Sequence, residues 1–447
     1  VRIVKDASEL QRVETGDILV AKITDPDWEP VMRKVAAVVT DQGGRTAHAA
    51  IVSREFGLPC IVGTGNSTEV LQDGSEVTVV CAEGSEGHVY DGRVDFVIER
   101  IDAAKVPPTQ TEVMLTVGDP GKAFELSFIP NAGVGLARTE FIVTNHIGIH
   151  PMALVRYPNL KDAKAVTEIG TRIGNEDPHE FFIRRFSEGI ARIAAAFYPK
   201  PVIVRTSDFK TNEYARLLGG AEFEPPEENP MLGFRGASRY YDERYADGFA
   251  LECKALLRVR RDMGLTNIKV MIPFCRTVAE GKRVIASMSE HGLTQRDDGL
   301  QVYAMCELPS NVVRGRDFLQ VFDGYSIGSK DLTQLVLGLD RDSGTVAYLF
   351  DERDDAVRDM IAAAIEAAKS AGKPIGICGQ APSDYPDFAR WLVEQGITSI
   401  SLNPDAAIKT QFVIAKAEAE LSHTPPAWAT SNVANLSRLP SSLPKAI

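Results

Sequence analysis

The sequence lacks the features of a membrane protein or a nucleic-acid-binding protein. No apolar run approaches the roughly 18 residues that a membrane-spanning helix needs, and the first residues show neither an apolar signal core nor a transit-peptide bias. The 49 lysines and arginines are outnumbered by 61 aspartates and glutamates, which gives a net charge of −12. This excess of acid argues against a general nucleic-acid-binding surface, and an anionic substrate would require a local cluster of cations.

The sequence also lacks a cysteine framework. None of the six cysteines belongs to a Cys-x-x-Cys pair, so we expect no zinc or disulfide scaffold and a protein of the reducing cytoplasm. The composition, 44% hydrophobic and 25% charged, is that of a globular protein and excludes a disordered or collagen-like chain. Because the sequence does not begin with methionine, we expect a fragment of a longer protein or a processed product.

The 447 residues divide by pattern into two regions and a tail. Residues 1–101 carry short β-rich runs and one helical stretch, Thr46–Phe56, which predicts a small α/β domain. A polar, proline-containing stretch at 102–112 is typical of a linker. Residues 113–422 form the larger predicted domain, and the Pro/Ser-rich residues 423–447 are predicted to be a disordered tail. The β-rich runs of the first region are DILVAKI, VAAVVT, CIVG and EVTVVCAEG.

Eight short apolar runs alternate with helical stretches in the larger region. They are continuously apolar, as expected of parallel strands buried on both faces. Eight such units predict a (β/α)8 barrel, with an open doubly wound sheet as the alternative; we favour the barrel because polar residues cluster at the carboxyl end of nearly every run. The runs are VMLTVG (113–118), GVGLAR (133–138), VIVRTS (202–207), KVMIPF (269–274), VYAMCE (302–307), GYSIGS (324–329), PIGICG (374–379) and TSISLN (398–403). The clearest predicted helices are 352–371 and 386–396, and the long segments 139–201 and 208–268 should be functional or carry helices of their own.

A histidine near the start of the first predicted helix is a candidate nucleophile. It lies in GGRTAHAAIVSREFG (43–57), just after a strand that ends at Thr40. Thr46 can cap the helix and place His48 in its first turn, where the helix dipole keeps the imidazole neutral and favours a nearby anion. This setting suits phosphorylation of the ring, with Arg45 as an additional cation. The alternative is a surface histidine at an ordinary helix start.

The carboxyl ends of the barrel runs supply further candidates, because active sites of such barrels lie there. These residues are Arg138, Arg205, Glu307, Asp331, Arg341 and Cys378, with Arg235 in the long segment after the third run. Four arginines indicate an anionic ligand, since arginine binds phosphate and carboxylate bidentately; the alternative is a set of surface ion pairs. The two acids suit Mg²⁺, or they are salt-bridged. By position alone, the cysteine is a buried strand residue.

The string GGRTAHAAIVSREFGLPCIVG resembles the swivelling phosphohistidine domain of the phosphoenolpyruvate-utilising enzymes. Later strings resemble the branch of that family that makes phosphoenolpyruvate from pyruvate, ATP and water. They are GLARTEF, DFKTNEYA, EENPMLGFRGASRYY, SIGSKDLTQLVLGLDRDS and GICGQAPSDYPDF. The resemblance runs from residue 1 to about 421 and covers both regions, so it implies a swivelling domain followed by a barrel that binds phosphoenolpyruvate and pyruvate.

The resemblance also implies a role for each candidate residue. His48 would carry the phosphoryl group, and Cys378 would exchange the methyl proton of pyruvate. Mg²⁺ would be held by Glu307 and Asp331, and would stabilise the enolate of pyruvate. The implied substrate-binding residues are Arg138, Arg205, Arg235, Arg341, Ser329 and Lys330.

The implied reaction moves a phosphoryl group between phosphohistidine and pyruvate, with 102–112 as a candidate hinge for the carrier. The family's full-length enzymes charge the histidine from ATP with a nucleotide-binding domain. We find none in this sequence, so ATP would act only through an absent domain or a partner subunit. A homodimer is a further expectation.

Four residues depart from the family pattern: Lys330 stands for Asn, Ala381 for Gly, Tyr385 for His, and Ala47 for Ser or Cys. Lys330 matters most, because the Asn belongs to the substrate-binding layer beside a metal ligand. Two alternative functions stay open. One is a related phosphotransferase with another acceptor, such as an alcohol or phenol, and the other is a non-catalytic or regulatory relative.

Overall fold

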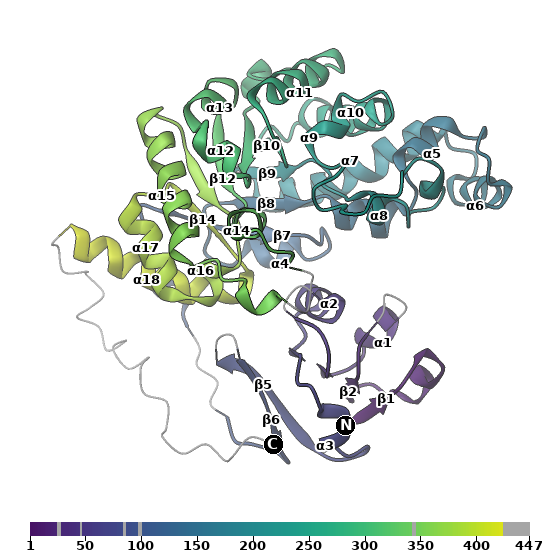
Figure 1. Cartoon of the computed structure of the whole chain (residues 1–447), viewed down its shortest axis with the longest axis vertical. Helices are drawn as coiled ribbons and strands as arrows, with labels where there is room; N and C mark the ends of the chain where they lie inside the picture. Colours follow the sequence, from purple (N-terminus) through teal and green to yellow (C-terminus); the bar gives the residue numbers. More distant parts are fainter. Residues whose placement is uncertain (25–27, 45–46, 84–85, 97–100, 342–345, 423–447) are drawn as a thin grey trace. The chain divides into compact units, whose positions relative to one another are not determined.

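The computed structural model describes residues 1–24, 28–44, 47–83, 86–96, 101–341 and 346–422. The chain forms two compact units (Figure 1). Of the described residues, the first unit contains those of Val1–Asp102 and Gly338–Asp351, and the second contains Ala103–Leu337 and 352–422. The predicted disordered tail, 423–447, lies outside the described residues. Among the residues that the structure describes, no helix is long and apolar enough to span a membrane.

The first unit is a small α/β domain, as predicted. Its four-stranded parallel sheet has the order β1-β2-β3-β4, and a separate antiparallel pair joins β5 and β6. The four predicted β-rich runs correspond to β2, β3, β4 and β5, whereas β1 and β6 were not predicted. The strands are β1 (Arg2–Val4), β2 (Ile18–Ala21), β3 (Ala37–Thr40), β4 (Cys60–Val62), β5 (Val77–Glu83) and β6 (Glu86–Asp91). The helices are η1 (Ala7–Arg12), α1 (Glu29–Met32), α2 (His48–Phe56), α3 (Ser67–Val70) and, in the segment 338–351, η7 (Ala347–Leu349).

The second unit is a closed barrel of eight strands in the order β10-β11-β12-β13-β14-β7-β8-β9. All neighbouring strands are parallel, and closure is direct because β14 pairs with β7 and β9 pairs with β10. The predicted (β/α)8 barrel is therefore confirmed, and the open sheet is excluded. The strands are β7 (Glu112–Val117), β8 (Val134–Arg138), β9 (Val202–Arg205), β10 (Ile268–Ile272), β11 (Val302–Cys306), β12 (Gly324–Ile327), β13 (Ile375–Ile377) and β14 (Ser399–Leu402).

Helices surround the barrel (Figure 1). The predicted helices 352–371 and 386–396 are confirmed as α15 (Asp355–Ser370) and α17 (Pro386–Gln395). Both long segments carry helices: η4 (Ile142–Ile147), α5 (Pro151–Arg156), α6 (Ala163–Ile173) and α7 (Pro178–Phe197) in the first, and α8 (Thr211–Tyr214), η5 (Gly220–Glu222), α9 (Ala237–Tyr240) and α10 (Ala246–Arg261) in the second. The others are η3 (Ala103–Lys105), α4 (Ala123–Ser127), α11 (Val278–Glu290), η6 (Asp297–Gly299), α12 (Pro309–Val313), α13 (Gly315–Val321), α14 (Ser329–Leu337), α16 (Ala381–Asp384) and α18 (Pro404–Leu421).

The barrel interior is packed with side chains. One buried cluster consists of Leu136, Ile203, Met271, Tyr303 and Met305, one residue or two from each of four strands. Alternate residues of a barrel strand point inward, so these side chains fill the axis in layers. The barrel is consequently a solid core, and a ligand can be held only at its ends.

Most of the predicted linker is held against the barrel unit. Both carboxylate oxygens of Glu418, on α18, accept hydrogen bonds from the backbone, at 2.9 Å from the nitrogen of Gln110 and 2.7 Å from that of Thr111. The Gln411 side chain donates to the carbonyl of Pro107 at 2.9 Å. The chain that enters β7 is thus fixed by the last helix, and β7 begins at Glu112.

Candidate active site

The carboxyl ends of the barrel strands bring several predicted residues together. Arg138 and Arg205 are the last residues of β8 and β9 and are paired in the strand register. Glu307 follows β11 directly, and Cys378 follows β13. Asp331 lies in the first turn of α14, the helix after β12. The parallel arrangement of the strands therefore places all five at one end of the barrel, here called the mouth.

Two mouth arginines share a buried carboxylate. Arg235 contacts Asp208 through two nitrogens, at 3.1 and 2.6 Å, and reaches Asp331 with a third at 3.0 Å. Arg205 lies 3.6 Å from Asp208 and 2.9 Å from Glu140. Although burial lowers the pKa of each arginine, the neighbouring carboxylates raise it above its ordinary value. Both guanidinium groups are thus permanent cations, held in fixed directions.

The sequence analysis missed Asp208 and Glu140. Asp208 begins the string DFKTNEYA, one residue after the predicted strand run VIVRTS. Glu140 lies in GLARTEF, two residues after the predicted run GVGLAR. A general signal was present, because an arginine buried at a barrel mouth requires a carboxylate partner. The identity of that partner depends on tertiary contacts that the sequence pattern does not show.

Glu307 has the properties of a cation ligand. It is fully buried, and one carboxylate oxygen accepts the backbone N–H of Phe274 at 2.6 Å. The other oxygen, Oε2, has no hydrogen-bond partner within the part of the chain that the structure describes. Burial, and then the negative charges of Asp331 and Asp208, raise the pKa of Glu307 to about 8. A buried carboxylate that repels its neighbours is stabilised by a bound cation.

No side chain fits on the backbone beside this oxygen. A Cβ atom at Gly328 would come within 2.7 Å of Glu307 Oε2, so the position requires glycine. Among the described residues, no cluster of three His, Cys, Asp or Glu side chains could hold a metal. The protein would thus offer two carboxylates, Glu307 and Asp331, and leave further positions to water and substrate oxygens, which is the usual manner of Mg²⁺ binding.

Cys378 lies where the mouth meets the packed axis. Its Sγ is 3.5 Å from the carbonyl oxygen of Ile327, and it packs against the axial cluster of the barrel. Burial raises the pKa of the thiol above its ordinary value, against the opposing effects of a hydrogen bond with Ser326 and the charge of Arg205. The protonated thiol therefore predominates at neutral pH, and the side chain can donate a proton.

Ser329 and Lys330 both interact with a buried acid that the sequence analysis did not identify. The Ser329 hydroxyl donates to Glu352, which also accepts the backbone N–H of Gln380 at 3.3 Å. Burial raises the pKa of Glu352, while the hydrogen bond from Ser329 and the positive charge of Lys330 oppose that shift. Lys330 thus faces a third carboxylate besides the proposed metal ligands.

The fourth predicted arginine lies in a different part of the chain. Arg341 is half-buried and belongs to Gly338–Asp351, the segment grouped with the first unit. Its role in substrate binding stays a prediction.

In the first unit, His48 is the first residue of α2 and is half-buried. Its Nδ1 lies 3.4 Å from the hydroxyl oxygen of Thr24. The N-cap position is occupied by Ala47, which has no side-chain oxygen, so the predicted capping by Thr46 is wrong in its position. Thr46 and Arg45 lie outside the described residues. His48 therefore stands at the N-terminal end of α2, where the helix dipole favours a nearby anion.

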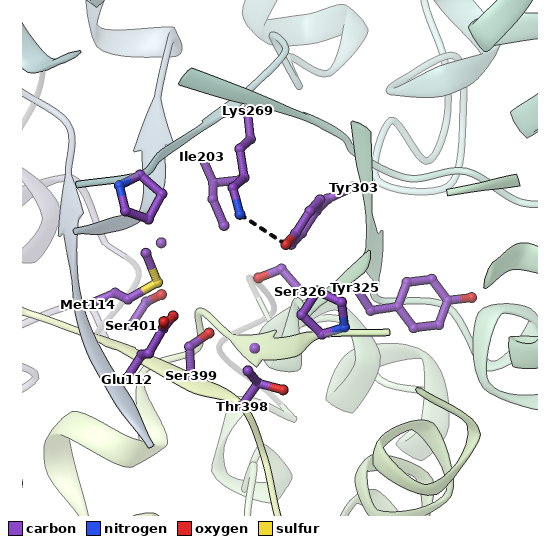
Figure 2. Close-up of a pocket in the computed structure, with 14 residues that line it drawn as sticks. Glu112, Met114, Ile203, Lys269, Tyr303, Tyr325, Ser326, Thr398, Ser399 and Ser401 are labelled. Carbon is purple, nitrogen blue, oxygen red and sulfur yellow. Dashed lines mark hydrogen bonds between the residues drawn. The ribbon is translucent and has the colours of Figure 1, made fainter. Parts of the chain in front are cut away.

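A polar pocket lies at the opposite end of the barrel (Figure 2). Lys269 donates to the hydroxyl of Tyr303 at 3.2 Å, and Glu112, Ser399 and Ser401 lie on the other side of the pocket (Figure 2). Its lining includes a single lysine and no arginine. We place the candidate active site at the mouth, because the arginines and the buried acids are there.

Comparison with known proteins gives a consistent result. Residues 97–419 match the family described as "PEP-utilising enzyme, PEP-binding domain", and residues 13–84 match "PEP-utilising enzyme, mobile domain". The chain is 55% identical over 422 residues to a phosphoenolpyruvate synthase of Synechocystis sp., which covers 94% of the chain and 52% of that protein. Proteins of the same name from Aquifex aeolicus and Deinococcus radiodurans are 51% and 56% identical, each over 94% of the chain and 54% of the relative. The chain spans about half the length of the curated relatives it matches.

Proposed function

The chain belongs to the family of PEP-utilising enzymes, and from that premise we propose that it transfers a phosphoryl group between His48 and pyruvate to form phosphoenolpyruvate. This is the second half of the reaction of phosphoenolpyruvate synthase (pyruvate, water dikinase), in which ATP, pyruvate and water give AMP, phosphoenolpyruvate and phosphate. One observation carries the proposal: the buried Arg235 and the half-buried Arg205 lie at a mouth that also holds Glu307 and Asp331. The mouth thus holds guanidinium groups in fixed directions, each paired with acidic side chains, where an anionic substrate would bind.

The arginines would bind the substrate through its two anionic groups. Phosphoenolpyruvate carries a carboxylate and a phosphate, and guanidinium groups bind both with paired hydrogen bonds. Arg138, Arg205 and Arg235 are the proposed binding residues in the barrel, together with Arg341, Ser329 and Lys330. Asp208 and Glu140 hold two of the arginines before the substrate arrives, which reduces the entropy lost on binding.

The proposed chemistry has two steps, a proton transfer from pyruvate and a phosphoryl transfer from His48. The minor, thiolate form of Cys378 takes a methyl proton from pyruvate: the S–H bond forms, the C–H bond breaks, and the electron pair moves into the enolate. The enolate oxygen then attacks phosphorus, so that the P–O bond forms while the P–N bond to His48 breaks and the imidazole keeps the electron pair. In reverse, the protonated thiol donates to the enolate carbon, a step that the raised pKa of Cys378 suits.

Glu307 and Asp331 are the proposed holders of Mg²⁺. When bound there, the ion supplies positive charge beside the enolate and phosphoryl oxygens. The Glu307 oxygen that has no hydrogen-bond partner among the described residues supports this assignment. Charging of the histidine from ATP is proposed to require residues outside this chain, either a nucleotide-binding domain or a partner subunit.

Other acceptors are disfavoured by the thiol. An alcohol or phenol needs no proton transfer at carbon, whereas Cys378 lies at the mouth beside Arg205 and Arg138, as a C–H acid/base would. The third possibility, a non-catalytic relative, has Lys330 as its main support.

Labelling of His48 tests the proposed function. The purified chain is incubated with labelled phosphoenolpyruvate and Mg²⁺, and we expect an acid-labile, base-stable phosphate on the protein. His48→Ala should abolish the label, while His88→Ala in the same unit should retain it. Equal labelling of His48→Ala would contradict the assignment of the carrier.

Proton exchange tests Cys378 separately. We expect Cys378→Ala to lose solvent deuterium uptake into pyruvate, because the other cysteines near the carboxyl ends of the strands, Cys275 and Cys306, are fully buried. Cys253→Ala, at a buried position within α10, serves as the control and should keep the exchange. Undiminished uptake in Cys378→Ala would refute its role.

A further inference from the structure

Phe274 combines a bulky side chain with an unfavourable backbone conformation. It lies two residues beyond the end of β10 and is buried, yet its φ is +47°, in the left-handed region. The other non-glycine residues with positive φ in the described chain, Arg296 and Asp298, lie in an exposed turn. A left-handed aromatic residue is rare, and such residues cluster at functional sites where the surroundings fix them.

The surroundings fix Phe274 from two sides. Its backbone N–H donates to Glu307 Oε1 at 2.6 Å. Behind it, a Cβ atom at Gly236 would lie 2.5 Å from the Phe274 Cβ and 2.7 Å from the carbonyl oxygen of Pro273, so only glycine fits there. The next residue, Ala237, donates its N–H to that same carbonyl at 3.0 Å. The loop that carries Arg235 is therefore packed directly against the turn at Phe274.

The ring of Phe274 faces two guanidinium groups. The Arg235 Cζ lies over the ring at 4.1 Å from its centre, and the Arg276 Cζ lies over it at 4.8 Å. Arg276 in turn donates to the carbonyl of Gly233 at 2.5 Å and to the Ser238 hydroxyl at 3.2 Å, on either side of Arg235 in the sequence. Aromatic faces attract cations most strongly where water is excluded, so the ring contributes to the direction of the Arg235 side chain.

We propose that Phe274 is a positioning residue that holds the Arg235 guanidinium in the direction required for binding the substrate anion. Its left-handed backbone, secured by Glu307 and Gly236, turns the ring toward the arginine. Asp208 and Asp331 bind the nitrogens of the Arg235 guanidinium, and the Phe274 ring packs against the flat face of that group. This inference rests on the proposed function, since it assigns the anion to the mouth arginines.

Phe274→Leu tests the proposal, because leucine keeps a buried apolar side chain and the backbone N–H but has no aromatic face. We expect the concentration of phosphoenolpyruvate that half-saturates His48 labelling to rise about tenfold, with a smaller change in the maximal rate. Phe274→Tyr retains the aromatic face and should stay near the wild type. Phe318→Leu, the same change at a buried site in α13, is the matched control and should leave half-saturation unchanged.

A double-mutant cycle separates positioning from general destabilisation. If Phe274 acts through Arg235, then Phe274→Leu should have no further effect on half-saturation in an Arg235→Ala background. Additive effects of the two substitutions, or a Phe274→Leu variant equal to Phe318→Leu, would overturn the proposal. If Phe274→Leu does not fold, Phe274→Met gives the same readouts with more of the volume retained. Failure of the wild-type chain to label at all would instead refute the proposed function.

Discussion

A buried carboxylate behind the mouth predicts an unusual dependence of stability on pH. Glu252, on α10, is fully buried and accepts hydrogen bonds from the Ser207 backbone N–H at 3.1 Å and from the Ser207 hydroxyl. Tyr245 contacts the same carboxylate at 3.4 Å. Burial raises the pKa of Glu252 to about 7, against the opposing hydrogen bonds from Ser207. Ser207 immediately precedes Asp208, so this acid supports the residue that holds the arginines.

Whether Glu252 stabilises the protein at low or at high pH depends on which state, native or unfolded, binds its proton more tightly. The ordinary pKa of the group is 4.5, and its native value is about 7, so the native state binds the proton more tightly than the unfolded state. The stabilising contribution is complete below pH 4.5 and is lost as the pH rises toward 7. At 1.36 kcal/mol for each unit of pKa, the loss is about 3 kcal/mol. Glu252→Gln, which cannot ionise and can still bond to Ser207, should remove this dependence.

Urea denaturation between pH 4.5 and 8 measures the effect. We expect the difference in unfolding free energy, Glu252→Gln minus wild type, to increase by about 3 kcal/mol across this range. Glu176→Gln is a control whose difference from the wild type should stay flat over this range, because the hydrogen bond with Arg184 lowers the pKa of Glu176 and its contribution is lost only below pH 4.5. A flat difference curve for Glu252→Gln would show that the carboxylate is ionised or solvated in the native protein, and would refute the reasoning.

Two further substitutions test the electrostatics of the mouth. Asp208→Asn removes a carboxylate that the buried Arg235 and the half-buried Arg205 share, and should lower the unfolding free energy by about 3 kcal/mol. Asp242→Asn breaks an exposed pair with Arg244 and should cost less than about 1 kcal/mol. Equal losses of unfolding free energy in urea denaturation would contradict the role of Asp208 as the shared partner of the two arginines. Lys330→Asn removes a positive charge next to Asp331 and should tighten Mg²⁺ binding in calorimetry, and equal or weaker binding would mean that Lys330 does not oppose the ion.

The architecture was predictable because its signals are local. Each of the eight barrel strands is a short, continuously apolar run, and a run needs only its own residues to be recognised. The positions of Arg138, Arg205, Glu307 and Cys378 at the mouth followed from the same runs, since each lies at or just after a strand end. β1 and β6 were missed, because neither has more than two consecutive apolar residues.

The contacts that make the mouth a site were not predictable from pattern. Glu140, after β8, pairs with Arg205 at the end of β9, and Asp208 pairs with Arg235, which lies 27 residues further along the chain. Glu252, on α10, lies 45 residues from its hydrogen-bond partner Ser207. The left-handed backbone of Phe274 has no signal in sequence, because glycine is the residue that normally marks it. The cap of α2 was misplaced by one position, as the geometry of helix starts often differs by a residue from the pattern.

The packed interior of the barrel also limits the route by which reactants can reach and leave the mouth. Because side chains of four strands close the interior, a molecule held by the mouth arginines cannot pass through to the other end. On the proposed function, pyruvate, phosphoenolpyruvate and the phosphohistidine must share one entrance. If the carrier fills that entrance during the transfer, the small molecule must bind before the carrier and leave after it.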